Sequence, residues 1–369
     1  MRPIAQDWTL TRQTPATRRR DATFDIAKGL AMVAIVLGHV NRGLGAAGMV
    51  STSSWWYEIL DTGLYLVHLC VFAFVAGLFV ERGVRRSRGE YLRARIGQAV
   101  YLYLLWSVLQ RATGILAGGA ANDAPVVSDL YRFWVPPGQL WFFGWLCIAA
   151  VAGAVLEPWR GRAHRGATVV VIALSCVVWG WNGHYVGTWG IALLAPYLVG
   201  VLLGVERVQR ALSASVAWRC VATIGCALVF AALLPELPTP PRPGGPVHTH
   251  DLVSGVLGGI LASAVGTAGI VIACAFVAEW RAFGWLAFVG KRSLEIFVAH
   301  ITVTASVRSA LRAVGVHNLP VHYVVATVAG VVAPLLLAAL LEQLRLPFFF
   351  TAPPWVTNRR VRTTSRTRV

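Results

Sequence analysis

The chain has 369 residues, of which 56% are hydrophobic and 13% charged, and its mean hydropathy is +0.62. A soluble globular protein carries about 25% charged residues, so this composition excludes one. The formal net charge of +17 would suit nucleic-acid binding in a soluble chain, but cytoplasmic loops rich in Lys and Arg explain it in a membrane protein, and no nucleic-acid partner is expected.

The apolar residues form long blocks, which suits spanning helices of about 20 residues each. The sequence therefore predicts an all-α polytopic membrane protein of about ten transmembrane helices. The expected spans are 24–44, 59–80, 96–117, 138–156, 167–181, 187–205, 218–234, 252–278, 293–314 and 320–342.

The distribution of Lys and Arg predicts the orientation of these spans. All but six of the 33 fall on one side, and the exceptions are Arg42, Arg111, Arg132, Arg242, Arg308 and Arg312. By the positive-inside rule, both termini are cytoplasmic. We expect a basic arm over 1–23, a membrane domain over 24–342 and a basic tail over 343–369, with the arm and tail attracted to anionic membrane lipid.

The first span carries ionisable residues on one stripe. His39 follows Lys28 by eleven residues and Asp25 by fourteen, which returns to nearly the same helical direction. His39 lies roughly 16 Å beyond Lys28, so its partner must come from another span. Ionisable groups inside a membrane are rare and usually functional, and neutral imidazole suits general-base chemistry on a hydroxyl. A structural histidine, with Asp25 and Lys28 marking the cytoplasmic interface, is the alternative.

Three later segments add candidates. The second span contains His68, and the ninth contains His300, each of which is explained equally well by a structural or a functional role. Trp141 begins the fourth span, where an aromatic belt and substrate binding are both reasonable explanations. The connection 81–95 holds six arginines, whose guanidinium groups are well suited to bind the phosphates of an acyl-CoA.

The positions of the cysteines and histidines in the sequence do not indicate a metal site or a disulfide bond. The six cysteines fall within or beside apolar spans, and none forms a CxxC or Cys/His metal spacing. We expect no metal site and no tightly bound cofactor.

Four short segments occur in order along the chain: FDIAKGLAMVAIVLGHV, VHLCVFAFVAGLF, QLWFFGWL and GKRSLEIFVAH. Together they resemble the motifs of acyltransferase family 3 of integral membrane proteins, closest to the branch of fucose 4-O-acetylase-like acetyltransferases. The family's second-span motif has Met-Pro where this chain has Leu69 and Cys70, and Ser where it has Ala76. The family's Arg-x-x-Arg begins here at Arg95 but ends at Gln98, while Arg82 and Arg85 offer the same spacing earlier.

The resemblance implies acyl transfer, most often of acetyl, from cytoplasmic acyl-CoA to a hydroxyl of an envelope glycan, a glycolipid or a related metabolite. It implies catalysis by His39, with His300 or His68 stabilising the oxyanion. Lys28, Arg82, Arg85 and Arg95 would bind the CoA phosphates, and Asp25 and Trp141 the substrate. The composition suggests a bacterial plasma membrane. Oligomeric state, acyl length, the membrane face of the acceptor and a covalent acyl intermediate stay open.

A proton-coupled transporter or flippase is the main rival. A transporter would carry ionisable residues, or Pro or Gly residues that break the helix, near the midplane of several spans. Five of the ten expected spans carry almost no ionisable residues. A catalytically inactive scaffold would be expected to lose His39, which this chain retains. A longer acyl group such as succinyl, or a cytoplasmic small-molecule acceptor, is compatible with the sequence.

Overall fold

The computed structural model describes residues 22–118, 122, 125–181, 183, 185–242 and 252–357, and these contain helices and no β-strand. The basic arm up to residue 21 and the tail from 358 lie outside these residues. The α-helices are α1 (Thr23–Ala46), α2 (Trp55–Leu78), α3 (Val80–Arg86), α4 (Arg88–Ala117), α5 (Trp141–Leu156), α6 (Arg162–Val177), α7 (Leu194–Leu212), α8 (Val216–Leu233), α9 (Leu252–Val277), α10 (Gly284–Lys291), α11 (Ser293–Ala313), α12 (Leu319–Gln343) and α13 (Pro354–Thr357).

Nine helical segments within the described part of the chain are long and apolar enough to cross a membrane, which confirms the all-α polytopic fold. The fifth expected span, 167–181, is α6, which has 16 residues and ends at Val177. At 1.5 Å per residue this helix is about 24 Å long, shorter than the roughly 30 Å of a bilayer's apolar core.

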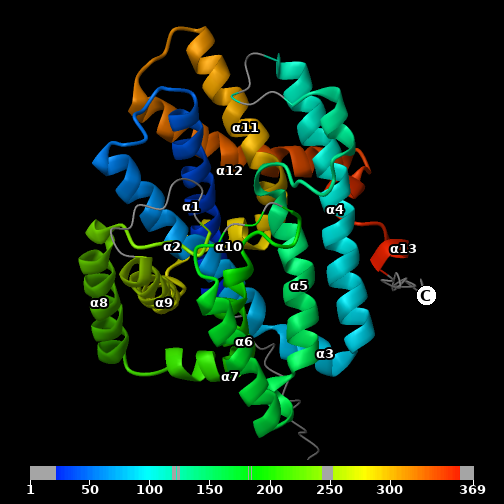
Figure 1. The fold of residues 1–369 in the computed structure, drawn as a ribbon. Coiled ribbons are helices and arrows are strands. Elements are labelled where there is room, and N and C mark those ends of the chain that lie inside the picture. The colour runs from blue at the N-terminus through cyan, green and yellow to red at the C-terminus, as the bar shows by residue number, and fades with distance from the viewer. Residues whose placement is uncertain are drawn as a thin grey trace, which may run out of the picture.

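Helix α1 lies at the centre of the bundle (Figure 1). It packs against α2, α9, α10, α11 and α12. Gly29 of α1 and Gly290 before α11 allow the closest of these approaches, because a Cβ on Gly290 would overlap the carbonyl oxygen of Asp25 and one on Gly29 that of Leu286. Small residues permit such backbone contact between membrane helices. The start of α1 is thereby fixed against α10.

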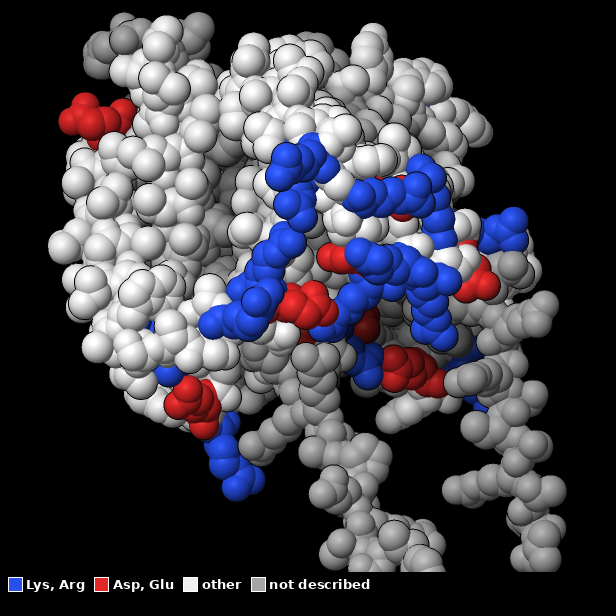
Figure 2. Space-filling model, turned by 90° about the horizontal axis from the view of Figure 1, so that it is seen from below, with Lys and Arg blue, Asp and Glu red and all other residues white. Residues whose placement is uncertain are grey.

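The arginine-rich connection expected over 81–95 is helical. It forms α3 and the first two turns of α4, whose N-cap Ser87 accepts a hydrogen bond from the Glu90 backbone N–H. Arg, Glu and Leu are good helix formers, so the helix continues beyond its apolar part. Helix α3 and the start of α4 lie at the end of the molecule where Lys and Arg side chains gather (Figure 2). We call this end the basic end.

The tail expected from residue 343 begins where α12 ends, but its first part packs back on the bundle. Gln98 of α4 donates to the Phe350 carbonyl oxygen and accepts from the Ala352 N–H, at 3.1 and 3.0 Å. Trp106 also donates to the Phe349 carbonyl oxygen at 2.8 Å. Helix α13 then contacts α4. The segment up to residue 357 therefore packs against the membrane domain.

Candidate functional site

A cavity of about 420 Å³ contains the first-span histidine, and we call it the histidine cavity. Side chains of α1, α2, α5, α11 and the loops before α5, α7 and α9 surround it. Its lining residues are Ile35, His39, Arg42, Tyr65, His68, Leu69, Gly138, Gln139, Trp141, Phe142, Trp189, Arg242, Phe297 and Ile301.

The structure brings the three predicted catalytic histidines together. His39 is partly exposed to the cavity, and His68 of α2 lines the same cavity. The His300 ring of α11 lies 5.1 Å from the His39 ring, measured between centroids. A side chain of another span therefore lies against His39, as the sequence requires of any partner.

Backbone hydrogen bonds determine which nitrogen of His300 carries a proton. Its Nδ1 lies 3.0 Å from the carbonyl oxygen of Ile296 and 2.9 Å from that of Phe297. Carbonyl oxygens only accept, so Nδ1 carries the hydrogen and Nε2 of the neutral ring is an acceptor. That buried Nε2 has no hydrogen-bond partner. Neutral His300 can thus accept a hydrogen bond or a proton near His39, but it cannot donate to an oxyanion from Nε2.

An ion pair that sequence reasoning missed borders the histidines. Arg42 lies one turn beyond His39 and donates two hydrogen bonds of 2.7 Å to Asp61 of α2. Its guanidinium carbon also lies 3.4 Å from the centre of the Tyr65 ring. The sequence shows that Arg42 lies one helical turn beyond His39. It does not show that Asp61 pairs with Arg42, because this contact depends on how α1 and α2 pack.

Trp141 lines the histidine cavity and is 5% exposed, so a lipid-facing aromatic belt does not explain it. Gln139, also missed, fixes the turn before Trp141 by donating to the carbonyl oxygens of Phe297 and Val298 at 2.9 and 3.2 Å. These contacts join the start of α5 to the helix that carries His300.

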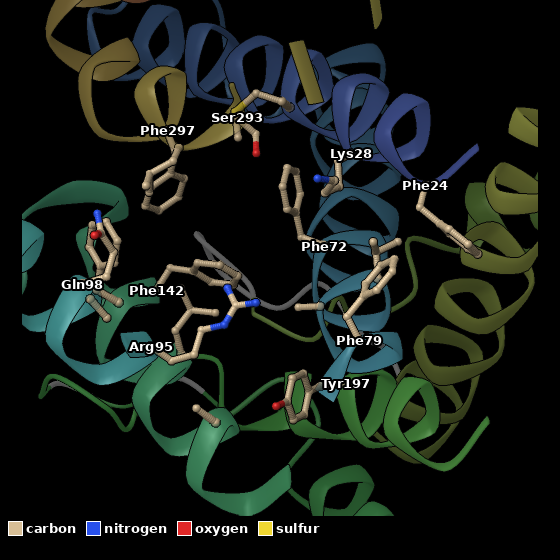
Figure 3. A pocket seen from close by; sticks show the side chains of 18 of the residues that line it. Phe24, Lys28, Phe72, Phe79, Arg95, Gln98, Phe142, Tyr197, Ser293 and Phe297 are labelled. Atoms are coloured by element: carbon tan, nitrogen blue, oxygen red, sulfur yellow. The ribbon is translucent and has the colours of Figure 1, made fainter. Parts of the chain in front are cut away.

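A larger cavity of about 980 Å³ lies toward the basic end, and we call it the basic cavity. Lys28 and Arg95 reach into it from opposite walls, with phenyl rings between them (Figure 3). Lys28 also pairs with Asp25 at 3.0 Å. Arg82, whose side chain is 46% exposed, lines the cavity too, so the cavity extends to the surface.

The remaining predicted donor-binding residue lies elsewhere. Arg85 lines neither cavity and pairs with Glu81 at 2.8 Å. Arg82 also has an acidic partner, Glu206 at 2.7 Å. Gln98, at the position where the family has its second arginine, lines the basic cavity as it holds the C-terminal segment. Thr351 of that segment lines the cavity as well, a contribution that sequence reasoning missed.

The two cavities share a wall of four apolar side chains, Ile35, Leu69, Phe142 and Phe297. We call this set the shared wall. Helix α1 runs past both cavities, with Asp25 and Lys28 in the basic cavity and His39 in the histidine cavity. The predicted stripe of ionisable residues on α1 therefore extends from the basic cavity to the histidine cavity.

The three histidines form no metal-binding cluster with other residues that the structure describes. Among the residues that the structure describes, no group of three or more His, Cys, Asp or Glu side chains could hold a metal ion. The cysteines of the described segments are free thiols.

The sequence was compared with known protein families, curated proteins and solved structures. Residues 21–339 match the acyltransferase domain of family 3, which is most of the chain. Neither the curated proteins nor the solved structures gave a match. The chain therefore belongs to acyltransferase family 3 and is a multi-pass membrane acyltransferase.

Proposed function

We propose that the chain transfers an acyl group, most readily acetyl, from acyl-CoA in the basic cavity to a hydroxyl group in the histidine cavity. The acceptor is a glycan, a glycolipid or a related metabolite of the cell envelope. One observation carries this proposal: the cavity with Lys28 and Arg95 and the cavity with His39 share a wall. A thioester at that wall has the donor phosphates on one side and a base on the other.

The basic cavity suits the donor. Acyl-CoA carries phosphates, which ammonium and guanidinium groups bind through charge-assisted hydrogen bonds. Lys28, Arg82 and Arg95 supply these groups, and Phe72 and Phe79 supply apolar surface for the pantetheine arm. Acyl-CoA is a substrate here, so no tightly bound cofactor is needed. By the positive-inside rule, the basic end faces the cytoplasm of a bacterial plasma membrane.

His39 acts as the general base in this proposal. It removes the proton from the acceptor hydroxyl as that oxygen attacks the thioester carbonyl carbon, forming a tetrahedral oxyanion. Collapse of this intermediate breaks the C–S bond, and the CoA sulfur leaves with the proton that His39 returns. Direct transfer accounts for this geometry without an acyl-His39 intermediate.

The other two histidines take different roles. The Nε2 of His300, an acceptor without a partner among the described residues, is available to a His39 N–H and would orient that ring, which makes His300 a positioning residue. His68 lines the cavity and its Nδ1 has no hydrogen-bond partner. In this proposal His68 donates to the oxyanion, for which a preorganised donor is worth about 2.7–4 kcal/mol.

Substitution of Arg95 tests this assignment of the donor cavity. Membranes containing the protein, incubated with acetyl-CoA labelled in the acetyl group, are expected to accumulate base-labile label in lipid or glycan fractions. Arg95→Ala is expected to raise KM for acetyl-CoA about tenfold or more, because a charged hydrogen bond contributes about 1.5–3 kcal/mol. The fall in kcat should be smaller, since this contact is made before and during transfer.

Arg85→Ala is the matched control for charge at the basic end. Arg85 is nearby in sequence but lines neither cavity, so its removal should leave KM within about twofold. An equal rise of KM in both variants would show that general surface charge, and not the basic cavity, attracts the donor.

A further inference from the structure

Arg242 is a buried arginine in the loop before α9, and no role has been assigned to it so far. It is 9% exposed and lines the histidine cavity. Its guanidinium carbon lies 4.9 Å from the centre of the Trp141 ring and 4.4 Å from that of Trp189. The two indole rings hold the flat guanidinium in place through cation–π contacts, which are strongest in desolvated sites.

Among the described residues, Arg242 lacks a partner of the kind that other enclosed arginines have. Arg42 is paired with Asp61, Arg219 with Glu279 at 3.4 Å, and Arg111 donates to backbone carbonyl oxygens. Within the described ranges, no carboxylate pairs with Arg242 and its buried Nε has no hydrogen-bond partner. Burial lowers the pKa of Arg242 to about 10, so the group stays charged at neutral pH. A buried charge without a counterion is costly, so a ligand that supplies the opposite charge would stabilise this site.

The surroundings of Arg242 select the sign of that ligand. No Asp or Glu is among the described residues that line the histidine cavity, and these residues include two guanidinium groups and two imidazoles. Asp61 neutralises Arg42, which leaves the charge of Arg242 uncompensated among the described residues. The planar fork of a guanidinium binds carboxylate and phosphate oxygens in pairs. The aromatic faces of Trp141, Trp189 and Tyr65 add apolar surface to the cavity, which at about 420 Å³ is in the range of small-molecule sites.

We propose that Arg242 binds an anionic group of the acceptor, a carboxylate or a phosphate ester on the sugar, and so presents a neighbouring hydroxyl to His39. This inference rests on the proposed function for the role of the ligand as acceptor. It names the acceptor class as acidic, in contrast to a neutral glycan. Carboxylate and phosphate ester share the chemistry that Arg242 recognises.

Binding can be measured without any transfer, which separates this inference from the proposed function. The probes are methyl α-glucuronide, glucose 1-phosphate and the neutral methyl α-glucoside, added to purified His39→Ala protein. A ligand that binds the folded state raises the midpoint temperature of unfolding. The two anionic probes should raise it and the neutral probe should not, and the larger of the two shifts identifies carboxylate or phosphate as the preferred group. Arg242→Gln in the same background should abolish the difference, while Arg242→Lys, which keeps the charge, should retain part of it.

Transfer to matched acceptors provides the second arm. With intact His39, Arg242→Gln is expected to lower kcat/KM about tenfold or more for the anionic sugar that binds best, and less than twofold for methyl glucoside. Equal losses for both acceptors would assign Arg242 to the oxyanion instead and overturn the proposal. Equal thermal shifts with all three probes, or no shift with any, would also overturn it. Selective anion binding without any transfer would contradict the proposed function and leave the anion site standing.

Discussion

Replacing His39 with alanine is expected to lower the initial rate of acyl transfer by about 10²–10⁴-fold, the usual contribution of a positioned general base. The attacking hydroxyl of a sugar is a poor nucleophile until its proton is removed. His39 is the histidine that lines the cavity and also contacts His300, whose Nε2 is available to orient it. The measurement is the rate of base-labile label transfer at saturating acetyl-CoA.

The control for this loss is another buried histidine. His322 of α12 is fully buried, its Nε2 is 2.9 Å from the Val316 carbonyl oxygen, and it lines neither cavity. His322→Ala, compared at equal amounts of folded protein, should keep most of the transfer rate. His300→Ala should be intermediate, with a changed pH profile, because it removes an orienting group. Full activity of His39→Ala would eliminate His39 as the base.

Leu69 gives the second large effect, because it belongs to the shared wall between donor and acceptor. Leu69→Trp should reduce transfer at least about 100-fold while acetyl-CoA still binds, since the larger ring blocks the contact between the cavities. Leu69→Ala should instead admit longer acyl groups and raise the ratio of butyryl to acetyl transfer about tenfold or more. One methylene in an apolar pocket is worth about 10–200-fold in specificity. The measurement compares kcat/KM for acetyl-CoA and butyryl-CoA.

Leu66→Ala controls for the loss of core packing. Leu66 lies on the same helix and is fully buried but lines neither cavity. Both alanine variants should destabilise the protein by about 2–5 kcal/mol, as such core truncations do. Only the variant at the shared wall should change the acyl preference. An unchanged butyryl-to-acetyl ratio in Leu69→Ala would show that the acyl group does not pass this wall.

Local patterns in the sequence were sufficient to predict most of the fold. Hydropathy blocks report spanning helices directly, and nine of the predicted spans correspond to helices long enough to cross a membrane. The structure differs from the sequence prediction at a charged segment that is helical and at an apolar segment whose helix is short. The sequence 81–95 forms helix despite its charge, and α6 is too short to meet the length of a bilayer core.

The candidate site was predictable only where one helix or one motif carries it. The stripe of Asp25, Lys28 and His39 follows from helical periodicity, and the family resemblance indicated His68 and His300. Arg242 could not be found this way, because it lies within a Pro-rich loop and reaches the cavity by tertiary packing. The shared wall likewise draws on four helices, and an apolar residue in a membrane span gives no sign of its neighbours.

In the proposed mechanism, the donor enters from the basic end and the acyl group leaves through the histidine cavity. The most direct measurement uses sealed membrane vesicles of both orientations, with labelled acetyl-CoA supplied only outside. CoA carries several charges and does not cross the bilayer. Inverted vesicles, which expose the cytoplasmic face, should form base-labile label in a His39-dependent way, and right-side-out vesicles should do so only after permeabilisation. Equal labelling of intact right-side-out vesicles, or labelling that survives His39→Ala, would contradict the account.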